Sequence, residues 1–427
     1  MRSDLALFGG TPVRRDPFPP YITIGEEEKR AVMEVLDTGI LSHFVGANEE
    51  AFYGGPRVRA LEADWAARFG VRHAVTFNSA TSALVAAVGA LEIGPGDEVI
   101  CSPYTMSASA TCVLAYNAIP VFADIEDETY GLDPDAVAAR ITPRTRALVV
   151  VHLFGHPARL DPLMDLARRR GLRLIEDAAQ APGATYRGRP AGTFGDIGVF
   201  SLNCHKTIQT GEGGVAVTDD ETLALRLRLI RNHGEAAVDG GMPVPNLVNT
   251  IGWNWRMIEI EAAIGGEQLR KLERLSKPRI ELAEHLTRRL AALPGIAPPA
   301  VAPDARHVYY VYPMRLDEAA AGLPRDRFTQ AVTAEGIGVY PGYQKPLYLQ
   351  PLYQQRIVYG NRGCPFTCGH YQGDVSYAKG ICPVAERLYE RELFFTDLCR
   401  PPLTTDDMDT VVRAFEKVLA HADALRG

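Results

Sequence analysis

The sequence lacks an excess of positive charge, a dense set of cysteines and a long apolar run. Lys and Arg number 45 against 52 Asp and Glu, and the net charge is -7, which argues against binding nucleic acid or an anionic membrane. Seven cysteines in 427 residues fit a reducing compartment better than a disulfide-rich secreted domain. Apolar stretches such as Ala147–Phe154 are too short to span a bilayer, and Met1–Gly10 carries no signal-peptide pattern. We therefore expect a cytoplasmic protein.

The proportions of 46% hydrophobic and 23% charged residues are those of a globular protein large enough for two domains. Short β-branched runs alternate with helical patterns, which is typical of βαβ units and of a mainly parallel sheet flanked by helices. The sequence thus predicts an α/β fold. The expected strands are His73–Phe77, Glu98–Ser102, Ile119–Ala123, Ala147–His152, Arg173–Glu176, Ile197–Leu202 and Gly214–Val217.

Local signals predict where several helices begin and end. The Asp133–Pro134 and Asp161–Pro162 pairs each suggest an N-cap followed by proline at the first helical position. The second of these helices should end at Gly171, a residue type that favours helix C-termini. A further helix is expected over Glu221–Arg231, and helical spacing of apolar residues predicts a long one over Met257–Leu275.

The chain divides into three predicted parts. Residues 1–55 form an N-terminal segment that packs on the body, 56–293 a large domain, and 294–427 a smaller C-terminal α/β domain. The proline-rich stretch Pro294–Pro303 is the linker candidate. Between about 344 and 380 the pattern becomes irregular and rich in glycine and tyrosine, which indicates an ordered insertion that shapes the substrate pocket.

Three polar side chains lie at predicted strand ends, where α/β sheets bind their ligands. Asp177 follows one strand, and Ser201 and Lys206 flank the end of the next. A lysine and a carboxylate from neighbouring strands suggest a site for pyridoxal phosphate, which needs Lys for a Schiff base and Asp to keep its ring nitrogen protonated. A simpler alternative for Asp177 is a helix cap.

A phosphate cradle is expected between a strand and a helix in the segment Asn78–Ala83. Amides at a helix N-terminus attract anions, and Thr81 and Ser82 add hydroxyls there. The simpler alternative is that these two residues only cap the helix, which uses the same free amides. Cys364, Cys368 and His370 lie close together, but their spacing is not that of a zinc site, so no metal is expected.

The order of motifs resembles the DegT/DnrJ/StrS family of pyridoxal-phosphate-dependent sugar aminotransferases, which have the type I aminotransferase fold. The resemblance covers most of the chain. The matching motifs are NSATSAL (78–84), IGPGDEVI (93–100), VHLFGHP (151–157), EDAAQA (176–181), HKTIQTGEGG (205–214), RNHG (231–234), GWNWRMIEIEAAIGGEQLRKL (252–272) and CPVAERL (382–388). The fold implied is a large domain with a seven-stranded, mainly parallel sheet and a smaller C-terminal α/β domain.

The resemblance also implies roles for single residues. Lys206 would form the Schiff base with pyridoxal 5'-phosphate and later move a proton, and Asp177 would pair with the ring nitrogen. Gln180 would lie beside the ring and its phenolic oxygen. Ser201 and Thr81 would bind the phosphate.

One implied contact crosses between subunits. Asn254 matches an asparagine that reaches the phosphate of the neighbouring subunit, which implies an obligate homodimer with shared active sites.

The sequence departs from the family pattern near the cofactor. The usual glycine before the phosphate-binding threonine is Ala80, whose neighbours Thr81 and Ser82 still offer their amides. The aromatic residue that covers the ring falls at Met106, and Tyr104 lies two residues earlier. Either could serve as the cover, Met106 through a sulfur–aromatic contact.

Lys206 favours transamination, because related dehydratases have a histidine at this position. The expected reaction moves an amino group from glutamate or glutamine to a keto-sugar in amino-sugar or antibiotic-sugar biosynthesis. A nucleotide-linked keto-sugar is the preferred acceptor. A keto-cyclitol of the inosose type and an elimination or dehydratase reaction are the alternatives. A non-catalytic pyridoxal-phosphate-binding regulator is disfavoured because both Lys206 and Asp177 are present.

Overall fold

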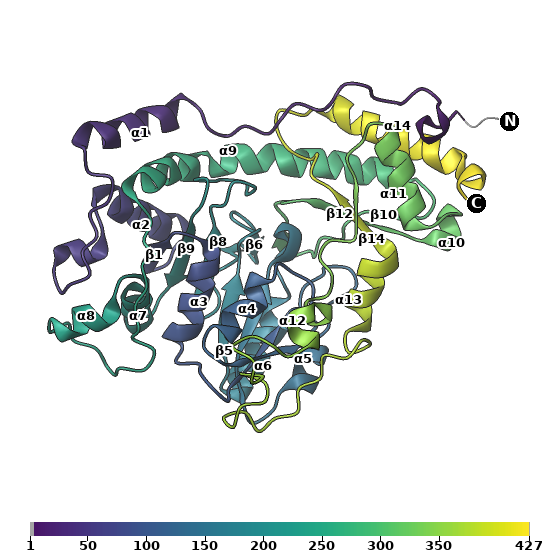
Figure 1. The fold of residues 1–427 in the computed structure, drawn as a ribbon. Coiled ribbons are helices and arrows are strands. Elements are labelled where there is room, and N and C mark those ends of the chain that lie inside the picture. Colours follow the sequence, from purple (N-terminus) through teal and green to yellow (C-terminus); the bar gives the residue numbers. More distant parts are fainter. Residues whose placement is uncertain (1–3, 427) are drawn as a thin grey trace.

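The structure, a computed structural model, describes residues 4–426 and is built around one large sheet (Figure 1). Its strand order is β1-β9-β8-β5-β4-β2-β3, with β9 antiparallel to both neighbours and the pairs from β8 to β3 parallel. The predicted α/β fold with a mainly parallel seven-stranded sheet is confirmed. The strands are β1 (His73–Phe77), β2 (Glu98–Cys101), β3 (Ile119–Phe122), β4 (Thr145–Val151), β5 (Arg173–Asp177), β8 (Ile197–Ser201) and β9 (Gly214–Thr218).

Helices connect and cover these strands. α5 begins as predicted, with the Asp133 side chain accepting a hydrogen bond from the Asp135 amide at 3.0 Å, and α6 ends at Gly171 in the left-handed conformation. The predicted cap at Asp161 is wrong: α6 begins at Leu160, two residues before Pro162, and the Asp161 carboxylate instead pairs with Arg187. The helices are α2 (Pro56–Phe69), α3 (Ala80–Ala90), α4 (Ala108–Leu114), α5 (Pro134–Arg140), α6 (Leu160–Arg170), α7 (Glu221–Arg231) and α8 (Gly234–Asp239).

The long helix α9 (Glu259–Leu290) runs over both halves of the molecule (Figure 1). It is longer than the predicted Met257–Leu275 and continues through Pro278, which usually breaks a helix at a cost of about 3 kcal/mol. Burial explains the continuation. Leu272 packs in a core that α9 shares with the large sheet. Leu286 packs in a second core, which α9 shares with the C-terminal sheet. Both ends of the helix are therefore held by apolar burial on either side of the proline.

The C-terminal part forms a smaller α/β unit. Its sheet has the order β10-β12-β14-β13, and a small sheet, β11-β6-β7, joins it to the large domain. β10 lies inside the predicted linker Pro294–Pro303, and the second core includes the end of α9. The domain limits at 55 and 293 remain predictions. The elements are β6 (Thr185–Tyr186), β7 (Arg189–Pro190), β10 (Ile296–Ala297), β11 (Ala305–Arg306), β12 (Tyr312–Leu316), β13 (Tyr340–Pro341), β14 (Leu393–Thr396), α10 (Glu318–Ala321), α11 (Arg325–Ala334), α12 (Pro351–Gln354), α13 (Pro383–Arg387) and α14 (Thr405–Ala420).

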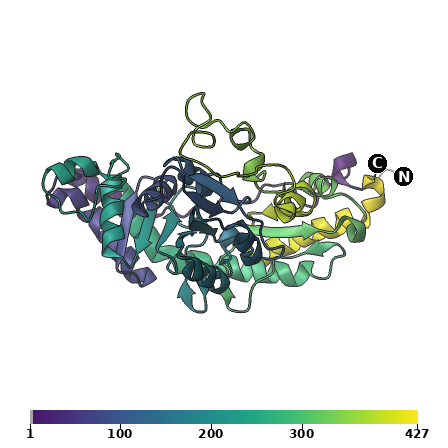
Figure 2. The same cartoon turned by 90° about the horizontal axis from the view of Figure 1, so that it is seen from below.

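The segment 344–380 projects from one side of the molecule (Figure 2). Its tyrosines fasten it to the large domain: Tyr377 donates a hydrogen bond to the Pro120 carbonyl at 2.8 Å, and Tyr371 donates to Glu98 at 2.8 Å. The segment thus packs beside β3, the edge strand, and covers part of an edge that would otherwise be open to other chains. No helix in residues 4–426 has the length and apolar character needed to cross a bilayer.

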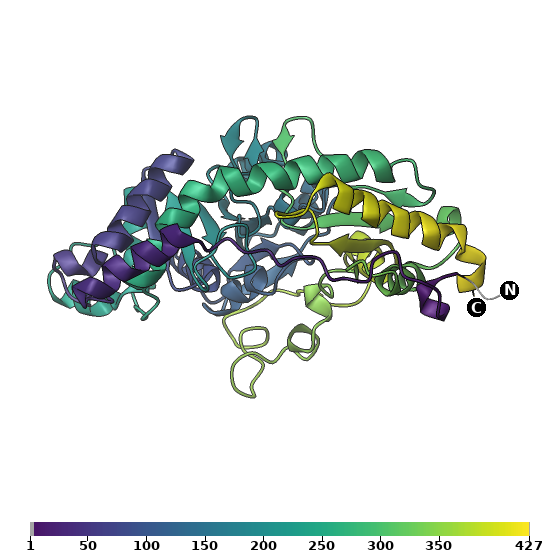
Figure 3. The same ribbon diagram turned by 90° about the horizontal axis from the view of Figure 1, so that it is seen from above.

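The N-terminal segment ties the two halves together (Figure 3). Leu5 is buried in the core of the C-terminal unit, and the chain then runs along the molecule to α1 (Glu26–Thr38), which packs on α9. This part of the chain therefore contacts both halves of the molecule.

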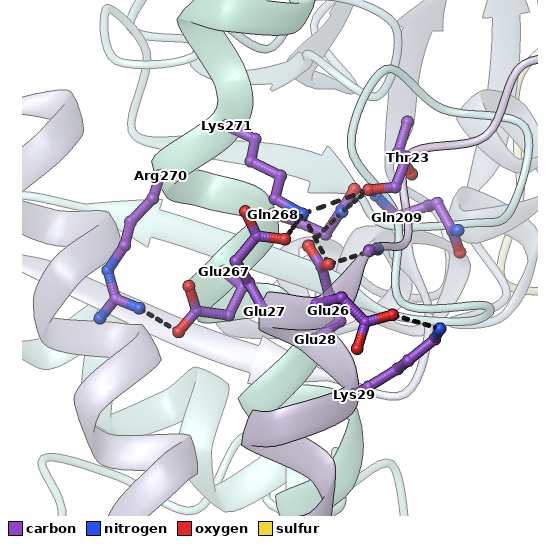
Figure 4. A network of polar contacts seen from close by, with 11 residues as sticks. Thr23, Glu26, Glu27, Glu28, Lys29, Gln209, Glu267, Gln268, Arg270 and Lys271 are labelled. Atoms are coloured by element: carbon purple, nitrogen blue, oxygen red, sulfur yellow. Dashed lines mark hydrogen bonds and ion pairs between the residues drawn. The ribbon is translucent and has the colours of Figure 1, made fainter.

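A buried carboxylate, Glu28, fastens α1 to α9 (Figure 4). Glu28 accepts hydrogen bonds from Lys271 at 2.6 Å and from Gln268 at 2.7 Å. Burial alone would raise the pKa of Glu28, but hydrogen bonds from Lys271, the Gly25 amide and Gln268 hold it below its ordinary value. Gln268 also accepts a hydrogen bond from the Gln209 amide at 3.2 Å. The same network therefore holds the loop that follows β8.

We predict that Lys271→Met destabilises the protein by about 3–5 kcal/mol, because it leaves the carboxylate of Glu28 buried without its cation. Urea unfolding followed by circular dichroism measures this loss. Lys29→Met is the control, since Lys29 pairs with Glu26 at the surface, where such pairs contribute little. Equal losses in the two variants would contradict the role given to Glu28.

Candidate functional site

A cavity of about 440 Å³ lies at the carboxyl ends of the parallel strands. Most of the predicted site residues line it: Ala80, Thr81, Met106, Asp177, Gln180, Ser201 and Lys206. The sequence analysis missed other residues in its wall, namely Ser79, Leu84, Thr105, Ala108, Val151, Ala179, Asn203, His205, Glu212, Gly213, Tyr310 and Gln344. Of the segment 344–380, Gln344 alone is in this wall.

Asp177 is the last residue of β5 and its carboxylate is held in place by two donors. Ser109 Oγ donates to Oδ2 at 2.7 Å, and the Ala179 amide donates to Oδ1 at 3.1 Å. No helix follows Asp177 directly, so the alternative role as a helix cap does not apply. Ser109 comes from α4 and has no sequence signal that links it to Asp177.

The residue before Asp177 fixes the end of this strand. Glu176 is fully buried and accepts hydrogen bonds from His152 at 2.8 Å and from the amides of Gly192, Phe194 and Gly195 at 2.5–2.8 Å. Burial would raise the pKa of Glu176, yet hydrogen bonds from His152 and from these amides keep it below its ordinary value. Since successive side chains on a strand point to opposite faces, anchoring Glu176 orients Asp177 toward the cavity.

Lys206 lies in the loop between β8 and β9. Burial lowers the pKa of its amine, and the negative charge of Asp177 partly opposes this shift. The Nζ atom lies 4.6 Å from the centre of the Tyr310 ring, a distance at which an ammonium is attracted to the ring face. The cavity therefore favours a neutral, nucleophilic lysine more than water does.

Gln180 is oriented from both ends of its amide. Its Oε1 accepts a hydrogen bond from the Phe154 amide at 2.7 Å, and its Nε2 donates to the Tyr343 hydroxyl at 2.9 Å. Phe154 has a φ of 58°, an uncommon backbone conformation for a bulky residue that is costly unless the surroundings hold it. The Tyr310 amide holds it further by donating to the Phe154 carbonyl at 2.8 Å.

Tyr310 and Tyr343 come from the C-terminal half of the chain. β12 begins at Tyr312, and Tyr309 just before it has a φ of 49°. This left-handed residue turns the chain so that Tyr310 faces the cavity. Tyr343 also lines the cavity.

The N-terminus of α3 borders the cavity at Ala80 and Thr81. Ser79 caps the helix by accepting a hydrogen bond from the Ser82 amide at 3.1 Å. A β-carbon at Gly214 would lie 2.5 Å from the Ala80 nitrogen, so glycine there lets β9 approach the helix start. The free amides of this first turn suit a phosphate.

Three predicted residues lie outside the cavity wall. The Ser82 hydroxyl donates to Asn78 at 2.6 Å and is buried. Tyr104 is fully buried in the core, whereas Met106 is 55% exposed and lines the cavity. Asn254 is exposed and its Oδ1 accepts a hydrogen bond from Arg256 at 2.7 Å. Its predicted role needs a second subunit.

Residues 4–426 hold no cluster of three or more His, Cys, Asp or Glu side chains that could bind a metal. Cys364 and Cys368 are free thiols. The polar groups that line the cavity include the Lys206 amine, the Asp177 and Glu212 carboxylates and the hydroxyls of Thr81 and Ser201.

Residues 23–376 match the DegT/DnrJ/EryC1/StrS aminotransferase family. The chain belongs to this family. The aminotransferase is 37% identical to an L-glutamine:2-deoxy-scyllo-inosose aminotransferase from Streptoalloteichus tenebrarius, over 99% of each chain. It is 38% identical to a GDP-perosamine synthase from Caulobacter vibrioides, over 76% of this chain and 84% of the relative.

The structure of an aminotransferase from Psychrobacter cryohalolentis superposes on this aminotransferase with a TM-score of 0.81 and 31% identity, covering 95% of this chain and all of the other. The fold is thus that of the type I aminotransferases, as expected. Members of this family are pyridoxal-phosphate-dependent enzymes that act on small molecules.

We predict that Asp177→Asn lowers the pKa of Lys206 further, because it removes the opposing negative charge while burial remains. In protein freed of cofactor, the rate at which trinitrobenzenesulfonate labels Lys206 should reach half its maximum at a lower pH than in the wild type. Peptide mass spectrometry identifies the labelled lysine.

Glu128→Gln provides the control for this titration, since it removes an exposed carboxylate outside the cavity. Its labelling profile should match that of the wild type. An unchanged profile in Asp177→Asn would show that Asp177 has no influence on the amine.

Proposed function

We propose that the protein is an aminotransferase that uses pyridoxal phosphate to move an amino group from glutamate or glutamine to a keto-sugar, with a nucleotide-linked sugar as the first candidate. The observation that supports this most is one cavity that holds the Lys206 amine, the Asp177 carboxylate and the start of α3. These are the three kinds of group that pyridoxal phosphate needs, for its aldehyde, its ring nitrogen and its phosphate.

The residues would hold the cofactor as follows. Lys206 would bind its aldehyde, Asp177 its ring nitrogen, and Thr81, Ser201 and the first amides of α3 its phosphate. When bound, pyridoxal phosphate supplies an electron sink for carbon–nitrogen chemistry.

The protein contributes orientation and proton transfer. Asp177, fixed by Ser109 and Ala179, keeps a negative charge at one place in a cavity of low dielectric. Gln180 is held by Phe154 and Tyr343, so its amide can orient a ring oxygen without first losing side-chain freedom. The Lys206 Nζ, whose pKa is lowered by burial, can accept and return a proton at the substrate carbon.

A keto-cyclitol is the second candidate for the acceptor. The Streptoalloteichus relative, named for a scyllo-inosose, matches 99% of this chain, whereas the Caulobacter relative, named for a GDP-sugar, matches 76%. A longer match supports a similar overall architecture, including the insertion. A substrate comparison with both acceptor types distinguishes the two candidates and also the elimination reaction, which would give no aminated product.

We also propose a homodimer with shared active sites. Large apolar side chains near Asn254 are exposed in the single chain: Leu247 by 66%, Ile251 by 69% and Trp253 by 49%. Exposed apolar surface of this kind commonly marks a protein interface, and Asn254 directly follows Trp253 in the chain. A cytoplasmic location remains a prediction from composition.

The first test is the visible absorption of the protein with added pyridoxal phosphate. The wild type should show the band of lysine-bound cofactor, and L-glutamate or L-glutamine should bleach it. Lys206→Ala should lack the band. Asp177→Ala should keep the band and turn over about 10- to 100-fold more slowly, the worth of a hydrogen bond to a charged group.

If the wild type shows no band, the proposed function is wrong. If the band forms but neither amino acid bleaches it, the cofactor assignment stands and the amino donor is different. A keto-sugar that restores the band in the bleached enzyme, with an aminated product, identifies the acceptor class.

A mixing experiment tests the shared site. Lys206→Ala and Asn254→Ala should each be nearly inactive alone. If Asn254 acts on the neighbouring subunit, random pairing of the two variants restores about a quarter of the sites. Unfolding and refolding the variants together, followed by an assay, measures this recovery. No recovery in mixtures that do form dimers would place Asn254 in its own subunit's site.

A further inference from the structure

A second cavity, of about 450 Å³, lies beside the catalytic one. The two cavities share His205 and Tyr310 in their walls. The second is formed by the N-terminal segment at Tyr21, by α9 at Arg279, and by the residues after β14 at Arg400. A substrate bound at Lys206 could therefore extend past Tyr310 into this space.

Arg279 is the unusual residue of this second cavity. It is only 3% exposed, its Nε has no hydrogen-bond partner, and its Nη1 makes one long hydrogen bond of 3.4 Å to the Tyr309 carbonyl. Within residues 4–426, no carboxylate forms an ion pair with it. The Tyr21 ring, 4.6 Å away, offers partial compensation. Burying a guanidinium without an anion costs free energy. The protein alone therefore leaves Arg279 without a full set of partners.

The other charged groups of the cavity leave the region positive. Arg400 pairs with Asp397 at 2.9 Å and lies 5.7 Å from the same Tyr21 ring. One carboxylate thus faces two guanidinium groups, with His205 at the border of the two cavities. Arginine presents several N–H donors in a planar fork that matches carboxylate and phosphate oxygens.

We propose that this second cavity is a substrate subsite that binds an oxyanion, with Arg279 as the main contact and Arg400 as the second. This inference rests on the proposed function, because that function supplies the substrates that could carry the oxyanion. Two sources have the required chemistry: the carboxylate of the amino donor, and the phosphate of a nucleotide-linked acceptor. A cyclitol acceptor has no such group, so the donor would then be the only source.

The experiment is a calorimetric titration of the folded protein with two unreactive probes, glutarate for the carboxylate and inorganic pyrophosphate for the phosphate. At least one probe should bind the wild type. Arg279→Gln should weaken that binding about tenfold or more, as expected for loss of a charge-assisted contact. Arg400→Gln should weaken it less, because Asp397 already neutralises part of its charge.

Arg274→Gln is the matched control, since it removes the same charge from an exposed position on α9. It should bind the probes like the wild type. Arg279→Lys, which keeps a cation, should bind more tightly than Arg279→Gln. If Arg279→Gln does not fold, Arg400→Gln and Arg279→Lys still report on the subsite.

The outcomes separate this inference from the proposed function. Tighter binding of glutarate assigns the subsite to the amino donor, and tighter binding of pyrophosphate assigns it to the acceptor. Binding of neither probe to the wild type, or equal binding by Arg279→Gln, overturns the subsite. The absorption band of lysine-bound pyridoxal phosphate, recorded for each variant, reports on the proposed function independently of either result.

Discussion

The buried carboxylate of Glu176 is the interaction on which the geometry of the site depends. It collects one hydrogen bond from His152 and three from the backbone amides of Gly192, Phe194 and Gly195. A carboxylate of this kind can remain charged inside a protein only when its oxygens are satisfied. Because Glu176 is fixed, the end of β5 is fixed, and Asp177 presents its own carboxylate to the cavity at a constant place.

The long helix α9 fixes the positions of larger parts of the molecule relative to one another. Its two ends are buried in different apolar cores, and Glu28 holds α1 against it through Lys271 and Gln268. The Gln209 amide, three residues beyond Lys206, joins the same network. The loop that bears Lys206 is therefore held by α9, which also packs in the core of the C-terminal unit. The same helix thus fixes this loop relative to the C-terminal unit.

Charge is arranged in opposite ways in the two adjoining cavities. Near Lys206, burial lowers the pKa of the amine and the charge of Asp177 only partly opposes this, so the neutral form of the amine is favoured more than in water. Beyond Tyr310, the guanidinium of Arg279 is buried, makes one long hydrogen bond to the Tyr309 carbonyl and forms no ion pair with a carboxylate of residues 4–426. One cavity is thus suited to bond formation and the other to recognition, and Tyr310 separates them.

Sequence patterns alone predict the βαβ order, all seven strands of the large sheet and the placement of Asp177, Ser201 and Lys206 at or beyond strand ends. These features follow from local periodicity and from the rule that parallel strands end at one edge.

Which distant residues surround Asp177 and line the two cavities becomes clear only from the folded chain. Ser109, Arg279 and Tyr310 lie far apart in the sequence. Tyr310 follows the left-handed residue Tyr309, and Arg279 lies on α9, which continues through Pro278. Local propensity disfavoured the last two features, and burial in two cores together with backbone hydrogen bonding overrode it. Contacts of that kind depend on packing between segments, which no short stretch of sequence encodes.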